Sequence, residues 1–194
     1  MAAIERRMTG VVARITGLPH DKAFAVQKQY LREHGTTLAG LMKTHAIDPQ
    51  TFIDEVHDVP IDVIPPDPDL RLALQRLPGR RLIFTNADLK HVERVLARLG
   101  IEDLFDDLFH IEMANYVPKP DLATFARMMR HHALSGPATC FFEDSSRNLE
   151  PAHDLGMTTV LVGPNALESE AAFVHHRTND LTAFLNAAAT KDIR

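Results

Sequence analysis

Three short apolar runs in the second half of the chain constrain its fold most strongly. They lie within residues 81–85, 138–142 and 158–162, and polar or glycine residues end or follow each of them. Apolar residues at helical spacing separate them, as Leu89, Val92 and Leu96 do after the first run. Short apolar strands that alternate with helices are typical of a parallel sheet covered on both faces. The pattern therefore predicts an α/β fold.

In the first part of the chain the apolar residues have a different spacing. From residue 2 to about residue 56 the apolar residues follow helical spacing, and no segment there is typical of a strand. Prolines and aspartates then dominate residues 59–69, which we expect to connect two units. The sequence thus predicts a helical unit at residues 1–60 and an α/β unit at 61–194. A further short strand is expected at residues 109–112.

Composition excludes several classes of partner. The 194 residues suit one domain with a small appendage. Lys and Arg number 21 against 26 Asp and Glu, and no basic stripe is present, so nucleic acid is not an expected partner. No apolar run is long enough to span a bilayer. Cys140 is the single cysteine, so no internal disulfide is possible, and the cytoplasm is the expected location.

The residues that follow the apolar runs are the candidates for chemistry, because ligands bind at the carboxyl ends of parallel strands. Glu143 and Asp144 follow the second run, and paired carboxylates suit Mg²⁺. Alternatively, one of these acids caps the helix that begins near Ser145. Thr85 and Asn86 follow the first run, where a hydroxyl and an amide suit a phosphate oxygen or simply form a turn.

Lys119 is a candidate because prolines flank it on both sides. The flanking rings restrict the backbone and hence the directions in which the ammonium can point. A fixed cation is what a transferring phosphoryl group requires as charge develops. The alternative is an ordinary solvated lysine in a loop.

Taken together and in order, these motifs resemble the haloacid dehalogenase (HAD) superfamily of phosphatases. The matching segments are 84–86, 118–121, 142–145 with Asn148, and 155–160. Residues 35–38 and 63–67 are similar to the pyrimidine 5′-nucleotidase branch. The resemblance covers residues 4–162 and implies a Rossmann-like parallel core with an N-terminal helical cap.

The resemblance also implies a reaction and a set of roles. The reaction is Mg²⁺-dependent hydrolysis of a small phosphate ester, with a nucleoside monophosphate expected as substrate. Thr85 would bind the phosphoryl group and Lys119 would neutralise its charge, while Asp144 would ligate Mg²⁺. Glu143 would act through water or from the next shell, and Asn148 would support this loop. Expected substrate contacts are Thr85, Asn86, Lys119, Thr36 and Thr37, with Tyr30 and His34 nearby in the cap.

One motif of the family is missing. Its nucleophile is the first Asp of an Asp-x-Asp-x-Thr motif at the end of the first strand. The one Asp-x-Asp here is Asp67-Pro68-Asp69, which follows Ile64-Pro65-Pro66 and matches the connecting segment. We therefore expect the first core strand to be missing and the sheet to be interrupted. Either Met1 is an internal position of a longer active protein, which the intact later motifs favour, or the chain is an inactive remnant.

Two other readings of function stay open. The chain could instead be a HAD-like protein that binds phosphate or a partner without catalysis. A third hypothesis, within the same superfamily, is hydrolysis of carbon–halogen bonds, which also uses an Asp nucleophile. That reaction needs no metal, so the Glu143-Asp144 pair argues against it. The adjacent histidines, His131-His132 among them, are expected to be surface or core residues, and Cys140 an inert buried thiol. Oligomeric state is not predictable.

Overall fold

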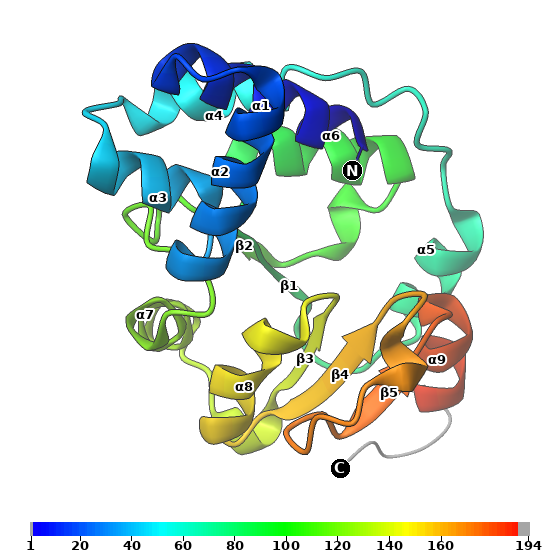
Figure 1. Ribbon diagram of the computed structural model, residues 1–194. Coiled ribbons are helices and arrows are strands. Elements are labelled where there is room, and N and C mark those ends of the chain that lie inside the picture. Colours follow the sequence, from blue (N-terminus) through cyan, green and yellow to red (C-terminus); the bar gives the residue numbers. More distant parts are fainter. Residues whose placement is uncertain (1, 190–194) are drawn as a thin grey trace.

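The computed structural model describes residues 2–189. The helices are α1 (Ala2–Thr16), α2 (His20–His34), α3 (Thr37–Thr44), α4 (Pro49–His57), α5 (Pro68–Gln75), α6 (Leu89–Leu99), α7 (Leu122–His132), α8 (Ser146–Asp154) and α9 (Leu181–Ala188). The strands are β1 (Leu82–Phe84), β2 (Asp107–Phe109), β3 (Cys140–Glu143), β4 (Thr158–Val162) and β5 (His176–Thr178). Single 3₁₀ turns lie at Glu102–Leu104, Gly136–Ala138 and Ala166–Glu168. Figure 1 shows α1–α4, in blue and cyan, grouped together above β3, β4 and β5.

Helices α1–α4 pack around one apolar core. Their predicted apolar faces meet there, and Val12, Leu41, Phe52 and Val56 are buried in it. Two of the four helices begin at side-chain caps: Thr36 accepts a hydrogen bond from the amide of Ala39, and Asp48 from that of Thr51. The helical character predicted for this part of the chain is confirmed.

The strands are all parallel and form two separate ladders. β1 pairs with β2, with Ile83 opposite Leu108, and β4 pairs with β3 on one side and β5 on the other. β1 and β3 belong to different ladders, although the rings of Phe84 and Phe141 approach to 5.9 Å between centroids. β1 and β3 are partly exposed, whereas the middle of β4 is buried. The α/β fold is confirmed, and the expected interruption lies between β1 and β3.

Two predicted boundaries need correction. The connecting segment ends at Asp67, whose carboxylate caps α5 by accepting from the amide of Leu70 at 2.9 Å. Pro68 then begins α5, because a first-turn proline has no hydrogen bond to lose. The strand expected at 109–112 lies at 107–109 instead. The chain turns after Phe109, and the amide of Ile111 donates to the carbonyl of Ala87.

The prediction of a buried Cys140 is also wrong. Cys140 is an exposed residue at the start of β3, and within residues 2–189 this strand pairs with β4 and no other strand. The protein around the thiol still removes enough water to raise its pKa to about 11. A raised pKa favours the protonated thiol at neutral pH, which is the less nucleophilic form.

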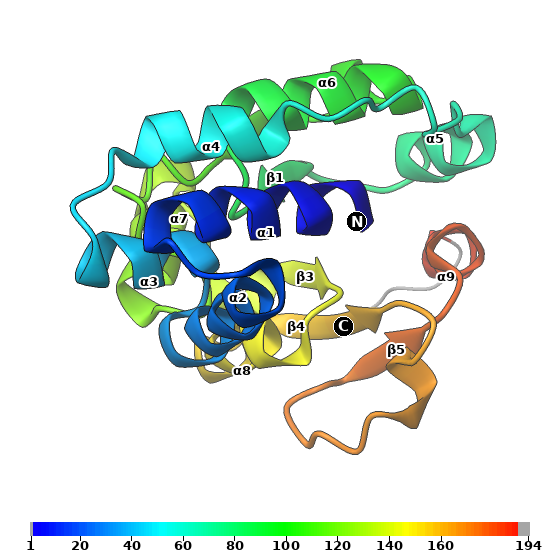
Figure 2. The same cartoon turned by 45° about the horizontal axis from the view of Figure 1, so that its top comes forward.

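The end of α4 contacts the start of α6, as Figure 2 shows from above. An ion pair joins Nδ1 of His57 to the carboxylate of Asp88, which also caps α6 by accepting from the amide of His91. The rings of His57 and His91 stack with centroids 4.4 Å apart. Burial acts to raise the pKa of Asp88, but the hydrogen bond and charge of His57 hold it below the usual value. These contacts fix the helical unit to the α/β unit.

Within residues 2–189, no helix has both the length and the apolar character needed to cross a membrane.

Candidate active site

The predicted site residues converge where β1 and β3 end. Thr85 and Asn86 directly follow β1, Glu143 is the last residue of β3, and Asp144 follows it. The segment between β2 and α7 brings Lys119 to the same place. Because parallel strands end at one edge of the sheet, these residues face a common region.

Asn86 holds the backbone at Lys119 through two hydrogen bonds. Its side-chain oxygen accepts from the Lys119 amide at 2.8 Å, and its side-chain nitrogen donates to the Lys119 carbonyl at 3.2 Å. A pair of bonds to one residue fixes position and orientation together. Asn86 is thus a positioning residue for Lys119, in addition to any contact with substrate.

The ammonium of Lys119 spans the interruption between the two ladders. Nζ donates to the carbonyl of Phe84, at the end of β1, at 2.9 Å. It also pairs with Oε2 of Glu143, at the end of β3, at 2.5 Å. The Lys119 and Glu143 side chains are only 7% and 8% exposed. Nζ lies 4.9 Å from the ring centroid of Phe84 and 5.3 Å from that of Phe141, which favours a cation there. Lys119 is therefore a buried, fixed cation and not a solvated lysine.

Glu143 is held in its ionised form. Burial acts to raise its pKa, but the charge and hydrogen bond of Lys119 hold it below the usual value. Its Oε1 accepts from the side chain of buried Asn148 at 3.2 Å and from the amide of Ser145 at 3.3 Å. Both carboxylate oxygens are therefore occupied by the protein, which leaves Glu143 poorly placed as a direct metal ligand.

Asp144 is the carboxylate that remains available to a cation. Partial burial raises its pKa, and so do the hydrogen bond and negative charge of neighbouring Glu143. A raised carboxyl pKa shows that the second negative charge is incompletely compensated. Hard divalent ions bind carboxylate oxygen and would supply that compensation. The donor set therefore fits Mg²⁺, with Asp144 as the direct ligand and Glu143 behind it.

The pairing of β1 with β2 positions Thr85. Its amide donates to the carbonyl of Phe109 at 2.9 Å, which continues the pairing of β1 and β2 by one residue. Its hydroxyl oxygen accepts from the amide of Ala87 at 3.0 Å and so forms the turn that was the alternative reading. A hydroxyl that accepts one bond still has a proton to donate, so the turn and a phosphate contact are compatible.

The turn between α2 and α3 lies over the Lys119 segment. Gly35 has a φ of +84°, and a Cβ built there would be 3.2 Å from Cγ of Pro118 and 3.3 Å from the carbonyl oxygen of Lys119. Glycine therefore suits both the backbone conformation and the close approach. Thr36 follows Gly35 in the chain and caps α3.

Thr37 does not join this group. Its side chain is buried, and its hydroxyl donates to the carbonyl of Gln27 in α2 at 3.3 Å. A hydroxyl committed to packing within the helical unit cannot reach a substrate without breaking that packing. Thr37 is therefore not among the proposed substrate contacts.

Arg147 was not among the predicted site residues. This residue lies in the first turn of α8, and its Nη1 donates to the carbonyl of Leu31 in α2 at 2.9 Å. Its other guanidinium nitrogen is 3.5 Å from the position of a Cβ at Gly35. Arg147 thus links the helical unit to the loop that carries Asp144. The available signal was a cation in a first helical turn, where the helix dipole disfavours it.

Comparison with known proteins identifies the family. The model of the haloacid dehalogenase-like hydrolases matches residues 2–156. This match covers most of the chain, and the protein belongs to that family of hydrolases.

Individual relatives agree with this assignment. Phosphate metabolism protein 8 of Saccharomyces cerevisiae is 31% identical over 163 residues, which cover 75% of this chain and 50% of that protein. The chain thus spans about half the length of this relative. A HAD phosphatase from Thermococcus onnurineus has a TM-score of 0.58 at 16% identity, covering 93% of this chain and 86% of its own. The magnesium-bound HAD-hydrolase YfnB of Bacillus subtilis has a TM-score of 0.61 at 14% identity, covering 96% and 91%. At these identities the structures show a shared fold.

Proposed function

We propose that this site hydrolyses phosphomonoesters with the help of Mg²⁺. The observation that carries the proposal is the buried Lys119–Glu143 pair beside Asp144, at the strand ends where Thr85 also lies. This arrangement supplies a fixed positive charge, a carboxylate for a cation and a hydroxyl donor. Those are the groups that stabilise a transferring phosphoryl group.

Each residue has a distinct task in this proposal. Lys119 neutralises negative charge that develops on the phosphoryl oxygens, and Asn86 holds its backbone in place. Thr85 donates its hydroxyl proton to one of those oxygens. Asp144 would hold Mg²⁺, with Glu143 supporting it, and the bound ion would supply further positive charge at the phosphoryl oxygens. We expect the turn at Gly35 and Thr36 to limit the entry of water, because Gly35 packs closely against Pro118 and Lys119.

The nucleophile of this reaction is a carboxylate carried by a further strand between β1 and β3. The two ladders are separate at that point, and their facing strands are more exposed than β4. A parallel strand there would pair with both and end beside Lys119. Its carboxylate oxygen attacks phosphorus, the ester oxygen leaves, and water then releases phosphate from the acyl phosphate. Residues 1–194 alone are therefore expected to be inactive or strongly impaired.

We further propose a pyrimidine nucleoside 5′-monophosphate as substrate. The similarity of residues 35–38 and 63–67 to the pyrimidine 5′-nucleotidase branch supports this choice. The close contact of Gly35 with the Lys119 segment supports a role for the first of these segments in substrate binding. Thr36 is the expected contact to the nucleoside.

The test compares residues 1–194 with a chain extended by the in-frame sequence upstream of Met1. With Mg²⁺, the extended chain should hydrolyse p-nitrophenyl phosphate and UMP at least ~10³-fold faster than residues 1–194. UMP should be preferred to AMP. Full activity of residues 1–194 would contradict the proposal that the nucleophile lies on an additional strand. An extended chain that binds phosphate but hydrolyses no phosphomonoester would contradict the enzymatic function and favour a binding role.

A further inference from the structure

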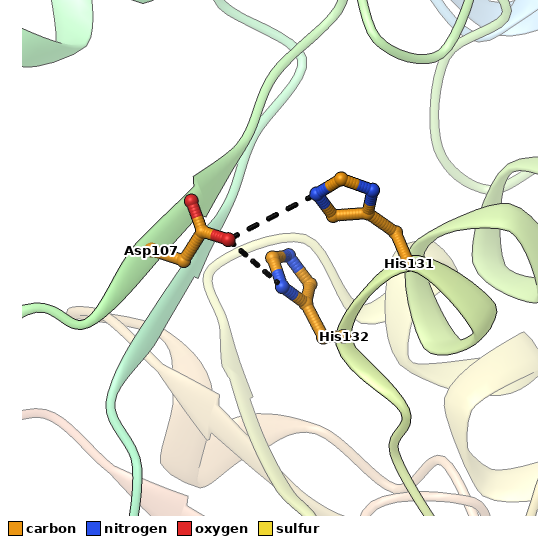
Figure 3. A group of neighbouring side chains, drawn as sticks. All are labelled: Asp107, His131 and His132. Carbon is orange, nitrogen blue, oxygen red and sulfur yellow. Dashed lines mark ion pairs between the residues drawn. The ribbon is translucent and has the colours of Figure 1, made fainter.

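Three potential metal ligands meet at the opposite end of β2. Asp107 begins β2, and His131 and His132 end α7. Figure 3 shows the Asp107 carboxylate directed at both imidazole rings. Its Oδ2 lies 3.4 Å from Nδ1 of His132 and 3.9 Å from Nε2 of His131. The three ligand atoms all lie within 4.8 Å of one another. Adjacent residues of a helix do not face each other, but the Asp107 carboxylate lies between the rings of His131 and His132 and is close to both.

The three side chains contact the protein on one side and are accessible to solvent on the other. Oδ1 of Asp107 accepts from the amide of Leu108 at 2.9 Å, which leaves Oδ2 for the rings. The ring of buried Phe109 contacts both imidazoles edge-on, at centroid distances of 6.0 and 6.2 Å. The His132 side chain is 1% exposed, whereas those of His131 and Asp107 are 45% and 51% exposed. An ion can therefore enter from solvent onto a partly fixed ligand set.

The charges around this cluster have opposing effects. Asp107 and the C-terminal end of α7 favour a cation. Arg80 opposes one, since its Nη1 donates to the carbonyl of His132 at 2.7 Å. Nε2 of His132 is buried without a hydrogen-bond partner among the described residues, and it must carry the ring proton when Nδ1 binds an ion, so this unpaired proton also opposes binding. The neutral ring keeps a lone pair, which is the form that binds metal.

We propose that Asp107, His131 and His132 form a binding site for a transition-metal ion of the Zn²⁺ type. Two imidazole nitrogens and one carboxylate oxygen are a common ligand set for zinc, with the fourth position left to water. In a tetrahedral site with bonds near 2.0–2.1 Å, ligand atoms lie about 3.3 Å apart. Separations of 3.4 Å, 3.9 Å and at most 4.8 Å require an inward movement of up to about 1.5 Å, which the exposed side chains of Asp107 and His131 can make. Mg²⁺ prefers oxygen ligands and does not suit this set.

This site is separate from the proposed phosphoryl site. Asp107 is at the amino end of β2, whereas the carbonyl of Phe109 at its carboxyl end bonds the amide of Thr85. A bound ion would join β2 to α7 and stabilise the fold. The proposal therefore stands or fails independently of catalysis, and its test uses no substrate.

Titration calorimetry of untagged residues 1–194 with ZnCl₂ at pH 7 tests the proposal. We expect one Zn²⁺ per chain and a higher melting temperature with Zn²⁺. His131→Gln and Asp107→Asn should each weaken binding by at least ~10-fold, because loss of a ligand costs no less than loss of a supporting residue. Both positions are exposed, so the variants should fold, and circular dichroism checks this. His153→Gln is the matched control, because His153 is an exposed histidine beside Asp154.

Each outcome of this experiment either supports or contradicts the proposed metal site. Binding by the wild type and the His153→Gln variant, weakened in the other two, supports the site. No binding of Zn²⁺ by the wild type would overturn it. Equal binding by the wild type and the His131→Gln variant would also overturn it, since the ion would then lie elsewhere.

Discussion

Replacing Lys119 with methionine should lower the free energy of unfolding by about 3–5 kcal/mol at pH 7, because it leaves the Glu143 carboxylate buried and unpaired. Methionine preserves much of the apolar stem that packs against Phe84 and Phe141. The loss is therefore chiefly electrostatic. Urea denaturation of residues 1–194 measures it. The same substitution should abolish phosphomonoesterase activity in the extended chain.

A second substitution tests this explanation. Adding Glu143→Gln to Lys119→Met removes the unpaired charge and should recover most of the lost stability. In the wild type the pKa of Glu143 is lowered, so its ion pair contributes stability above the ordinary carboxyl pKa. Without Lys119 its pKa should rise, so the difference between wild type and variant should shrink as pH falls from 7 to about 4. Lys22→Met, at an exposed lysine, is the control. A pH-independent loss that Glu143→Gln does not reduce would contradict the electrostatic account.

Replacing Asp144 with asparagine should lower activity without lowering stability. Turnover in the extended chain should fall by at least ~10²-fold, because the direct carboxylate ligand for Mg²⁺ is lost. The raised pKa of Asp144 means that its ionised form is unfavourable in the fold, so it costs stability above the ordinary carboxyl pKa. Asparagine removes that cost, and the melting temperature near pH 7 should not decrease. Phosphate release and a thermal melt measure the two effects.

The pH profile gives a further check on Asp144. Mg²⁺-dependent turnover should increase as pH rises through its raised pKa, since the ionised carboxylate binds the metal. Asp154→Asn, at an exposed acid that ends α8, should change neither activity nor stability. Loss of stability in Asp144→Asn without loss of turnover would assign Asp144 a structural role instead.

Much of the fold was predictable because local patterns determine it. Helical spacing predicted α1–α4, and apolar runs predicted β1, β3 and β4. β5 was not predicted, because its sequence His176-Arg177-Thr178 is polar and its pairing with β4 is a tertiary property. The exposure of Cys140 was missed for a related reason, because an apolar strand sequence does not reveal how many neighbours the strand has.

The candidate residues at the strand ends could be selected from the sequence, but the hydrogen bonds between them could not. The rule that ligands bind at strand ends selected Thr85, Glu143 and Asp144. The backbone bonds from Asn86 to Lys119 join residues 33 positions apart and leave no local sequence signal. The bond from Thr37 to the carbonyl of Gln27 also left no local signal, because a residue in the first turn of a helix can face either a neighbouring helix or solvent.

The central claim is that a carboxylate on a strand between β1 and β3 attacks the phosphoryl group held near Lys119. The most direct measurement traps the covalent intermediate in the extended chain during turnover with Mg²⁺. Acid quenching followed by borohydride reduction converts an aspartyl phosphate to homoserine, which peptide mass spectrometry locates. The account predicts homoserine at one aspartate of the added strand and at no aspartate of residues 1–194. Homoserine at Asp67, Asp144 or another aspartate within residues 1–194 would contradict it, as would steady turnover with no modified aspartate.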